Sequence, residues 1–155
     1  MFFDVSQLQP FLQILLAALL GGIIGIEREY RKKQAGLKTF SLLAVGSCLF
    51  TLVSIELSTL GGYPQTQVDL TRVIQAVATG VGFIGAGLII FRQFQVEGIT
   101  TAAGLWVTSA IGIAVGAGAY FLAILVALFT VLILAGFRLI EEKAFGKFSR
   151  KKHDE

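Results

Sequence analysis

Cysteine, histidine and charged residues are scarce in this sequence of 155 residues. The single cysteine, Cys48, excludes an internal disulfide framework and a cysteine-based zinc site. The single histidine, His153, lies among charged residues at the C-terminal end, so a metal centre held by several histidines is excluded too. Only 15% of the residues are charged, whereas an ordinary soluble domain has about 25%. This shortage of charge argues against a soluble enzyme.

Apolar residues make up 55% of the chain, 18 glycines add to them, and the mean hydropathy is +0.78. Such a composition excludes a disordered chain and a collagen-like chain. It indicates a helical membrane protein instead.

Five apolar stretches are long enough to cross the hydrocarbon core of a bilayer, which takes about 20 residues of helix. They run over Pro10–Ile26, Thr39–Leu57, Thr71–Phe91, Ile99–Gly116 and Tyr120–Phe137. Pro10 suits the first turn of its helix, where a missing N–H is no loss. A soluble protein of this length could not surround five apolar helices with polar ones. We therefore predict an all-α polytopic membrane protein with five transmembrane helices over residues 1–140, followed by a short basic tail over residues 141–155.

The basic residues predict how the chain is oriented. Twelve of the thirteen lysines and arginines lie in alternate connections or in the tail, and Arg72 is the exception. The positive-inside rule places those twelve in the cytoplasm, so we expect the N-terminus outside and the C-terminus cytoplasmic. The nine residues before the first stretch carry no positive charge, which is typical of an anchor and not of a cleaved signal peptide.

Small residues recur every four positions in three of the stretches, a spacing that lets membrane helices pack closely. The series are Ala17, Gly21, Gly25; then Ala78, Gly82, Ala86; then Gly104, Thr108, Gly112, Gly116. We expect helix packing at Gly21, Gly25, Gly104, Thr108, Gly112 and Gly116. The spacing leaves open whether the partner helix belongs to the same chain or to a second copy. The alternative is that some glycines mark kinks or a narrow passage.

The spans lack the residues typical of catalysis and cofactor binding. They contain no histidine, no pair of carboxylates on one helix face and no Ser–His or Cys–His set. The string GVGFIG at residues 80–85 matches a dinucleotide-binding pattern, but it lies inside an apolar span without the acidic residue needed about 20 positions later. No acidic residue lies at depth, which argues against a metal pathway within one subunit. We expect no enzyme activity, no cofactor, no bound metal and no nucleic-acid partner.

Charged residues gather at the ends of the spans. Glu56, Asp69 and Arg72 lie at the outer ends of the second and third stretches, and Arg72 is the one basic residue on that side. They form either a fixed ion-pair cluster that pins two helices or a small polar vestibule.

Three strings, taken together with the five spans, resemble a known family. They are GGIIGIEREYRKKQAGLKT at residues 21–39, DLTRVIQAVATGVGFIGAGLI at residues 69–89 and GITTAAGLWVTSAIGIAVGAGAY at residues 98–120. The chain resembles the membrane domain of the MgtC/SapB family over about residues 10–140. The family pattern maps onto Glu27, Arg28, Glu29, Gly36, Lys38, Thr39, Asp69, Arg72, Gly80, Gly82, Gly85, Gly87, Thr100, Thr101 and Trp106.

Two features depart from the pattern of the family. Many members carry a soluble domain after the fifth span, so this chain is expected to be a short form without it. Lys38 and Phe40 stand where the family usually has arginine and histidine. A titratable role is lost there, and Lys38 is left as at most a cytoplasmic contact for an anion or a lipid.

The resemblance implies a multi-pass protein of the bacterial plasma (inner) membrane, linked to magnesium limitation or stress. The expected function is a non-catalytic regulator that acts through helix contacts. Its expected partners, besides the lipid bilayer, are a second copy in a homodimer or other homo-oligomer, or another membrane protein complex. The alternative is a transporter of magnesium, another cation or a small solute.

Overall fold

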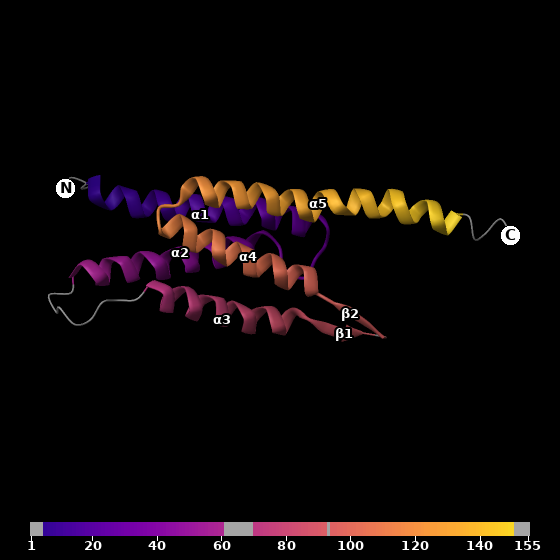
Figure 1. Ribbon diagram of the computed structural model, residues 1–155, viewed down its shortest axis with the longest axis horizontal. Coiled ribbons are helices and arrows are strands. Elements are labelled where there is room, and N and C mark those ends of the chain that lie inside the picture. The colour runs from indigo at the N-terminus through magenta and orange to yellow at the C-terminus, as the bar shows by residue number, and fades with distance from the viewer. Residues whose placement is uncertain (1–4, 61–69, 93, 151–155) are drawn as a thin grey trace.

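Five helices make up most of the chain and lie side by side along one long axis (Figure 1). The computed structural model describes the backbone of residues 5–60, 70–92 and 94–150, and the side chains of residues 8–59, 70–91 and 94–136. The helices are α1 (Val5–Tyr30), α2 (Leu37–Leu60), α3 (Leu70–Leu88), α4 (Ile99–Gly116) and α5 (Tyr120–Arg150). Within the described residues, four of them, α1 to α4, are long and apolar enough to cross a membrane, and the apolar part of α5, Tyr120–Gly136, is shorter. The predicted all-α polytopic membrane fold is confirmed.

The helix α2 forms the centre of the bundle, with α1 and α4 packed against it. Phe40, Ala44 and Cys48, spaced four residues apart along one face of α2, have no exposed surface. Alanine and cysteine on this face leave room for the backbones of the neighbouring helices. The core is therefore built where three helices meet, and it holds Ala17, Leu20, Ile24, Leu105, Ile111 and Val115 besides the residues of α2.

The helix α3 lies at the edge of the bundle (Figure 1). Only 11% of its most apolar segment is buried, whereas half of that of α4 is. Val81 and Gly85 are its buried residues within the described part of the chain. The rest of its surface is left for lipid or for another protein.

A short hairpin, absent from the sequence prediction, joins α3 to α4. Its strands β1 (Ile90–Arg92) and β2 (Gln95–Glu97) are antiparallel, with Phe91 paired to Val96. The third apolar stretch was predicted to reach Phe91, but α3 ends at Leu88 and the last residues of the stretch form β1. Strands of three residues are too short to show an alternating pattern in a sequence.

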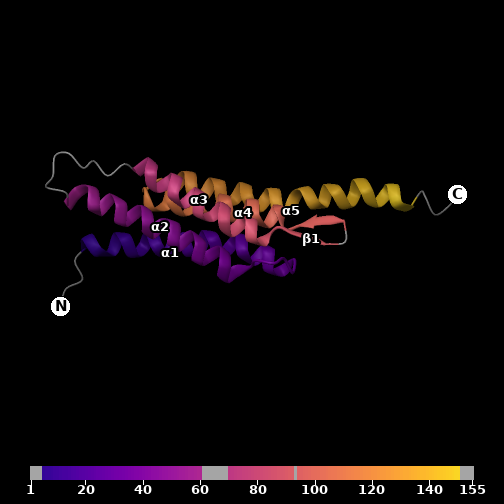
Figure 2. The ribbon, with the colours of Figure 1, turned by 90° about the horizontal axis from the view of Figure 1, so that it is seen from below.

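Two helix boundaries also differ from the prediction. The helix α1 begins at Val5, so Pro10 lies inside it and not in its first turn. The helix α5 continues without a break across residue 140 to Arg150. The predicted boundary between the membrane domain and a tail therefore falls inside a helix. Figure 2 shows these last turns and the hairpin extending beyond the end of α1.

Two helices end in the same hydrogen-bonded turn. After α1, the N–H of Lys33 donates to Arg28 O at 3.0 Å and the N–H of Lys32 donates to Glu29 O at 2.9 Å. This is a Schellman motif, and Lys32 holds its left-handed position with a φ of 54°. After α4 the same position is held by Gly118, with a φ of 80°. A lysine there costs about 1 kcal/mol of backbone strain that a glycine avoids.

Candidate functional site

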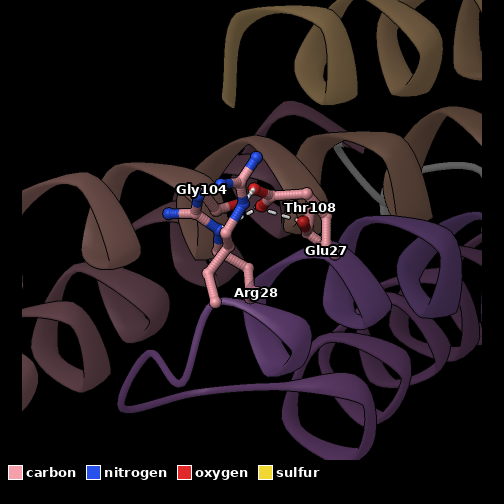
Figure 3. A network of polar contacts seen from close by, with 5 residues as sticks. Glu27, Arg28, Gly104 and Thr108 are labelled. Carbon is pink, nitrogen blue, oxygen red and sulfur yellow. Dashed lines mark hydrogen bonds and ion pairs between the residues drawn. The ribbon is translucent and has the colours of Figure 1, made fainter. Parts of the chain in front are cut away.

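The last turn of α1 carries an ion-pair cluster. Arg28 Nε donates to Glu27 Oε2 at 2.6 Å, and Arg31 Nε lies 3.4 Å from Glu27 Oε1. Arg28 is only 4% exposed. Figure 3 shows Glu27 and Arg28 extending from the end of α1 toward α4, which carries Gly104 and Thr108. The single carboxylate of Glu27 thus holds two guanidinium groups against the bundle.

Glu29 and Gly36 hold the connection between α1 and α2. Glu29 Oε2 accepts a hydrogen bond from the N–H of Leu37 at 2.9 Å, so its carboxylate caps the first turn of α2. A Cβ at Gly36 would lie 2.7 Å from Glu29 Oε2. A larger residue at Gly36 would push the Glu29 side chain away from this position, so both motif residues hold the connection beside the ion-pair cluster.

A cavity of about 710 Å³ lies at this same end of the bundle, which we call the basic end. It is lined by Arg28, Lys32, Lys33, Gln34, Val96, Glu97, Gly98, Ile99, Thr100 and Thr101. The basic end thus brings the motif residues Arg28, Thr100 and Thr101 together around one cavity. Lys38 and Thr39, which the sequence placed in the same motif, are exposed on α2 and do not line it.

The glycines of α1 bring its backbone into contact with α2. A Cβ at Gly21 would lie 2.6 Å from Phe40 O, and one at Gly25 would lie 2.6 Å from the Cα of Leu37. Both distances are shorter than any real Cβ contact. Any larger residue at Gly21 or Gly25 would force the two helices apart.

The glycines of α4 approach α2 from its other side. A Cβ at Gly112 would collide with the carbonyl oxygen of Ala44, and one at Gly116 would lie 2.8 Å from Cys48 O. Gly104 lies against the ring of Phe40, at 3.4 Å for an added Cβ. Thr108 is fully buried and donates to Gly104 O at 2.8 Å. Within these contacts the small residues of α1 and α4 meet a helix of their own chain.

The glycines of α3 behave differently. An added Cβ at Gly80, Gly82 or Gly87 would meet nothing within 4 Å, whereas one at Gly85 would lie 3.3 Å from the Cβ of Ala102 on α4. Three of the four motif glycines on α3 therefore serve no contact within the described part of the chain. Trp106 is 54% exposed on α4 and is not a core residue.

Gln13 is a buried polar residue that the sequence did not single out. It is 5% exposed, and its Nε2 donates to Val115 O at 2.9 Å and to Gly116 O at 3.3 Å. The last carbonyls of a helix have no partner within it. At the end of α4, Gln13 provides a donor to the Gly116 carbonyl and a second donor to the Val115 carbonyl, which also accepts the N–H of Gly118. The sequence does contain a signal that could have identified it, because Gln13 is the only amide in the apolar stretch Pro10–Ile26.

The end of the bundle opposite the basic end holds the remaining candidates. Glu56 lines a cavity of about 770 Å³ together with Gln9 and Gln13. Arg72 lines a different, mostly apolar groove of about 650 Å³ between α2 and α3. Asp69 lies outside the described residues, so the predicted cluster of Glu56, Asp69 and Arg72 stays a prediction. No group of three His, Cys, Asp or Glu side chains that could hold a metal ion occurs within the described ranges.

The amino-acid sequence is similar to those of several known proteins. A sequence profile of the MgtC family matches residues 14–143. The protein SrpB of Synechococcus elongatus is 39% identical over 141 residues, which cover 86% of this chain and 77% of SrpB. The protein of Escherichia coli K12 named putative magnesium transporter YhiD is 41% identical over 137 residues, which cover 88% of this chain and 64% of YhiD.

A more partial match is the protein MgtC of Brucella abortus. It is 44% identical over 102 residues, which cover 66% of this chain and 40% of that protein. The matches to YhiD and MgtC thus cover less than two thirds of those relatives. No solved structure matches the chain.

Proposed function

Because this chain belongs to the MgtC family, we propose that it is a non-catalytic regulator that responds to magnesium limitation or stress. It acts through helix contacts, with a second copy of itself or with another membrane protein. The chain is a multi-pass protein of the bacterial inner membrane. A regulator of this kind needs a helix surface that its own fold leaves free.

The outer face of α3 is the observation that carries this proposal. Gln75, Thr79, Gly82 and Ala86 follow one another at helical spacing and are all exposed. The amide of Gln75 has no hydrogen-bond partner among the described residues, while Thr79 Oγ1 donates to the carbonyl of Gln75 within its own helix. We call these four residues the α3 face.

Lipid is a poor match for the α3 face. An amide without a hydrogen-bond partner in hydrocarbon costs several kcal/mol of free energy. Glycine has no side chain, so it offers lipid tails little surface for van der Waals contact. A second helix satisfies both needs, because small residues let two backbones approach and polar side chains bond across the contact. This favours a homodimer or other homo-oligomer built on α3.

The interior of a single copy offers little support for ion passage. The core between α1, α2 and α4 is lined by apolar side chains such as Ile24, Phe40 and Leu105, all without exposed surface. Hydrated magnesium gives up its water reluctantly and binds through carboxylates or other oxygen ligands. These features favour regulation over conduction.

Transport of magnesium, another cation or a small solute is the second candidate. It is favoured by the cavity that Glu56 and Gln13 line, at the end opposite the basic end. The name of the relative YhiD points the same way. Flux of magnesium into proteoliposomes that contain the purified chain tests this candidate, with Glu56→Gln as the variant. Flux above that of empty vesicles that Glu56→Gln abolishes supports transport, and flux equal to that of empty vesicles contradicts it.

The substitution Gly82→Leu tests the regulator directly. An added side chain at Gly82 meets nothing in the monomer, so the fold is expected to survive. A leucine in a close helix contact weakens self-association at least ~10-fold by overpacking. The readouts are energy transfer between labelled copies in vesicles and growth of the host at low magnesium.

Gly136→Leu is the matched control. Gly136 on α5 also faces open space, so the two variants differ only in the helix surface they alter. We expect Gly136→Leu to behave as the wild type in both readouts. If Gly82→Leu also matches the wild type in both, the α3 face has no role in regulation.

A further inference from the structure

The cavity at the basic end is surrounded by groups that bind anions. Arg28, Lys32 and Lys33 line it, against the single carboxylate of Glu97. An excess of positive charge around a cavity attracts anions and raises their local concentration. Neither the family match nor the proposed function accounts for this cavity.

The N-terminus of α4 also opens into the cavity. The residue before it, Gly98, provides no side-chain hydrogen bond to the first turn, and Ile99, Thr100 and Thr101 line the cavity wall. The first N–H groups of a helix have no partner within it, and the helix dipole adds partial positive charge at that end. Helix N-termini of this kind commonly bind phosphate groups.

Two buried polar side chains point to a ligand independently of the helix terminus. Thr101 is 2% exposed and lines the cavity, yet its hydroxyl has no hydrogen-bond partner among the described residues. Arg28 is 4% exposed and bonds Glu27 through Nε, which leaves its two terminal nitrogens without an acceptor in the same part of the chain. Buried polar groups are nearly always hydrogen-bonded in native proteins. An oxyanion in the cavity would supply the missing acceptors.

We propose that this cavity, between the end of α1 and the start of α4, is a binding site for a phosphate-type anion. Arg28 and the N–H groups of α4 hold its oxygens, Thr101 donates through its hydroxyl, and Lys32 and Lys33 supply charge from the rim. The ligand is either a free phosphate compound or the phosphate of a lipid headgroup. Two N–H groups of a guanidinium match the geometry of a phosphate.

Lys32 offers a substitution that separates binding from folding. It holds the left-handed position of the Schellman motif with a φ of 54°, where glycine is the preferred residue. The change Lys32→Gly thus removes a charge from the cavity and relieves backbone strain. Combined with Lys33→Gln it lowers anion affinity while leaving the fold intact or more stable.

The experiment measures two probes on the full chain. The first is inorganic phosphate, followed by equilibrium dialysis of the protein in a neutral maltoside detergent. The second is phosphatidylglycerol against phosphatidylcholine, with retained lipid counted by native mass spectrometry after extraction from vesicles containing equal amounts of both. Saturable phosphate binding identifies a soluble ligand, and selective retention of phosphatidylglycerol identifies a headgroup.

The double variant Lys32→Gly/Lys33→Gln is expected to lower the affinity for whichever probe binds by at least ~10-fold, since each basic residue near an anion contributes to the binding free energy. Lys38→Gln is the matched control: the sequence left Lys38 as at most an anion or lipid contact, but in the structure it is exposed on α2 and does not line the cavity. It is expected to bind as the wild type does. The proposal is overturned if neither probe binds, or if Lys38→Gln weakens binding as much as the double variant.

Discussion

Gln13 shows how a single amide joins three elements of the bundle. It lies on α1, its Nε2 bonds the last carbonyls of α4, and it lines the cavity that also contains Glu56 on α2. Without Gln13, the carbonyl of Gly116 would lose this donor, whereas the carbonyl of Val115 would keep the N–H of Gly118. Such a bond in a membrane protein contributes on average about 0.6 kcal/mol and at most about 1.7 kcal/mol.

We expect Gln13→Leu to lower the free energy of unfolding by about 1 kcal/mol. Gln9→Leu is the control, because Gln9 lies one turn earlier on the same helix and is exposed. The measurement is the midpoint of unfolding in increasing mole fractions of SDS. Equal midpoints for the two variants would show that the bonds to Val115 and Gly116 contribute nothing.

Residue types alone could predict part of the site. The spacing of Gly21, Gly25 and Gly112 predicted close packing, because a series of small residues leaves a groove on whichever helix carries it. In the structure an added Cβ at each of these glycines would collide with the backbone of α2. The same spacing on α3 gave no packing at Gly82, because the neighbour that fills a groove is set by the three-dimensional fold. Thr101 beside Arg28 was likewise beyond prediction, since more than 70 positions of sequence separate them.

At the scale of elements, α2 acts as the hub because its small side chains face two glycine-bearing helices at once. Ala44 receives Gly21 from α1 and Gly112 from α4. A change at either glycine therefore disturbs a contact of the hub. The exposed glycines of α3 have no such role. Replacing a glycine by alanine should therefore lower the stability of the fold on α1 or α4, but not on α3.

Gly112→Ala is expected to destabilise the fold by about 1–3 kcal/mol, because the new methyl group collides with the carbonyl of Ala44. Gly82→Ala is expected to be neutral or to stabilise the helix by up to about 1 kcal/mol, since alanine is the better helix former. Thermal unfolding in detergent, followed by circular dichroism, compares the two. A Gly112→Ala protein as stable as Gly82→Ala would contradict the packing of α4 on α2.

Element boundaries could be predicted where composition changes sharply. The predicted Ile99–Gly116 stretch matches α4, which begins after Gly98 and ends before the turn at Gly118. The hairpin at residues 90–97 could not be predicted, because its first residues continue the apolar stretch of α3. The length of α5 beyond residue 137 was underestimated because its charged residues resemble a solvated tail, although they are good helix formers.

At the scale of the whole molecule, the basic residues determine the expected orientation. The connection between α1 and α2 and the hairpin lie at the same end of the bundle (Figure 2). The excess of lysine and arginine at this end predicts that it faces the cytoplasm. The anion site proposed there would then meet the phosphates of the cell interior or of the inner leaflet.

Single cysteines test this orientation in a Cys48→Ala background. Tyr30→Cys lies at the basic end, where Tyr30 is 84% exposed, and Thr59→Cys lies near the opposite end of α2. In intact spheroplasts we expect an impermeant maleimide to label Thr59→Cys and not Tyr30→Cys. The reverse pattern would show that the basic end faces outward. The wild type serves as the control for nonspecific labelling, since its single cysteine, Cys48, has no exposed surface.

Photo-crosslinking from α3 in native membranes tests the central claim, that this helix makes the functional contact. A photoreactive phenylalanine analogue replaces Phe83 next to Gly82, and in a matched control it replaces Phe121 on α5; the two side chains are 82% and 80% exposed. We predict a defined adduct from position 83, with a second copy of the chain or with one membrane protein, and no adduct from position 121. Adducts from neither position, or equally from both, would contradict the account.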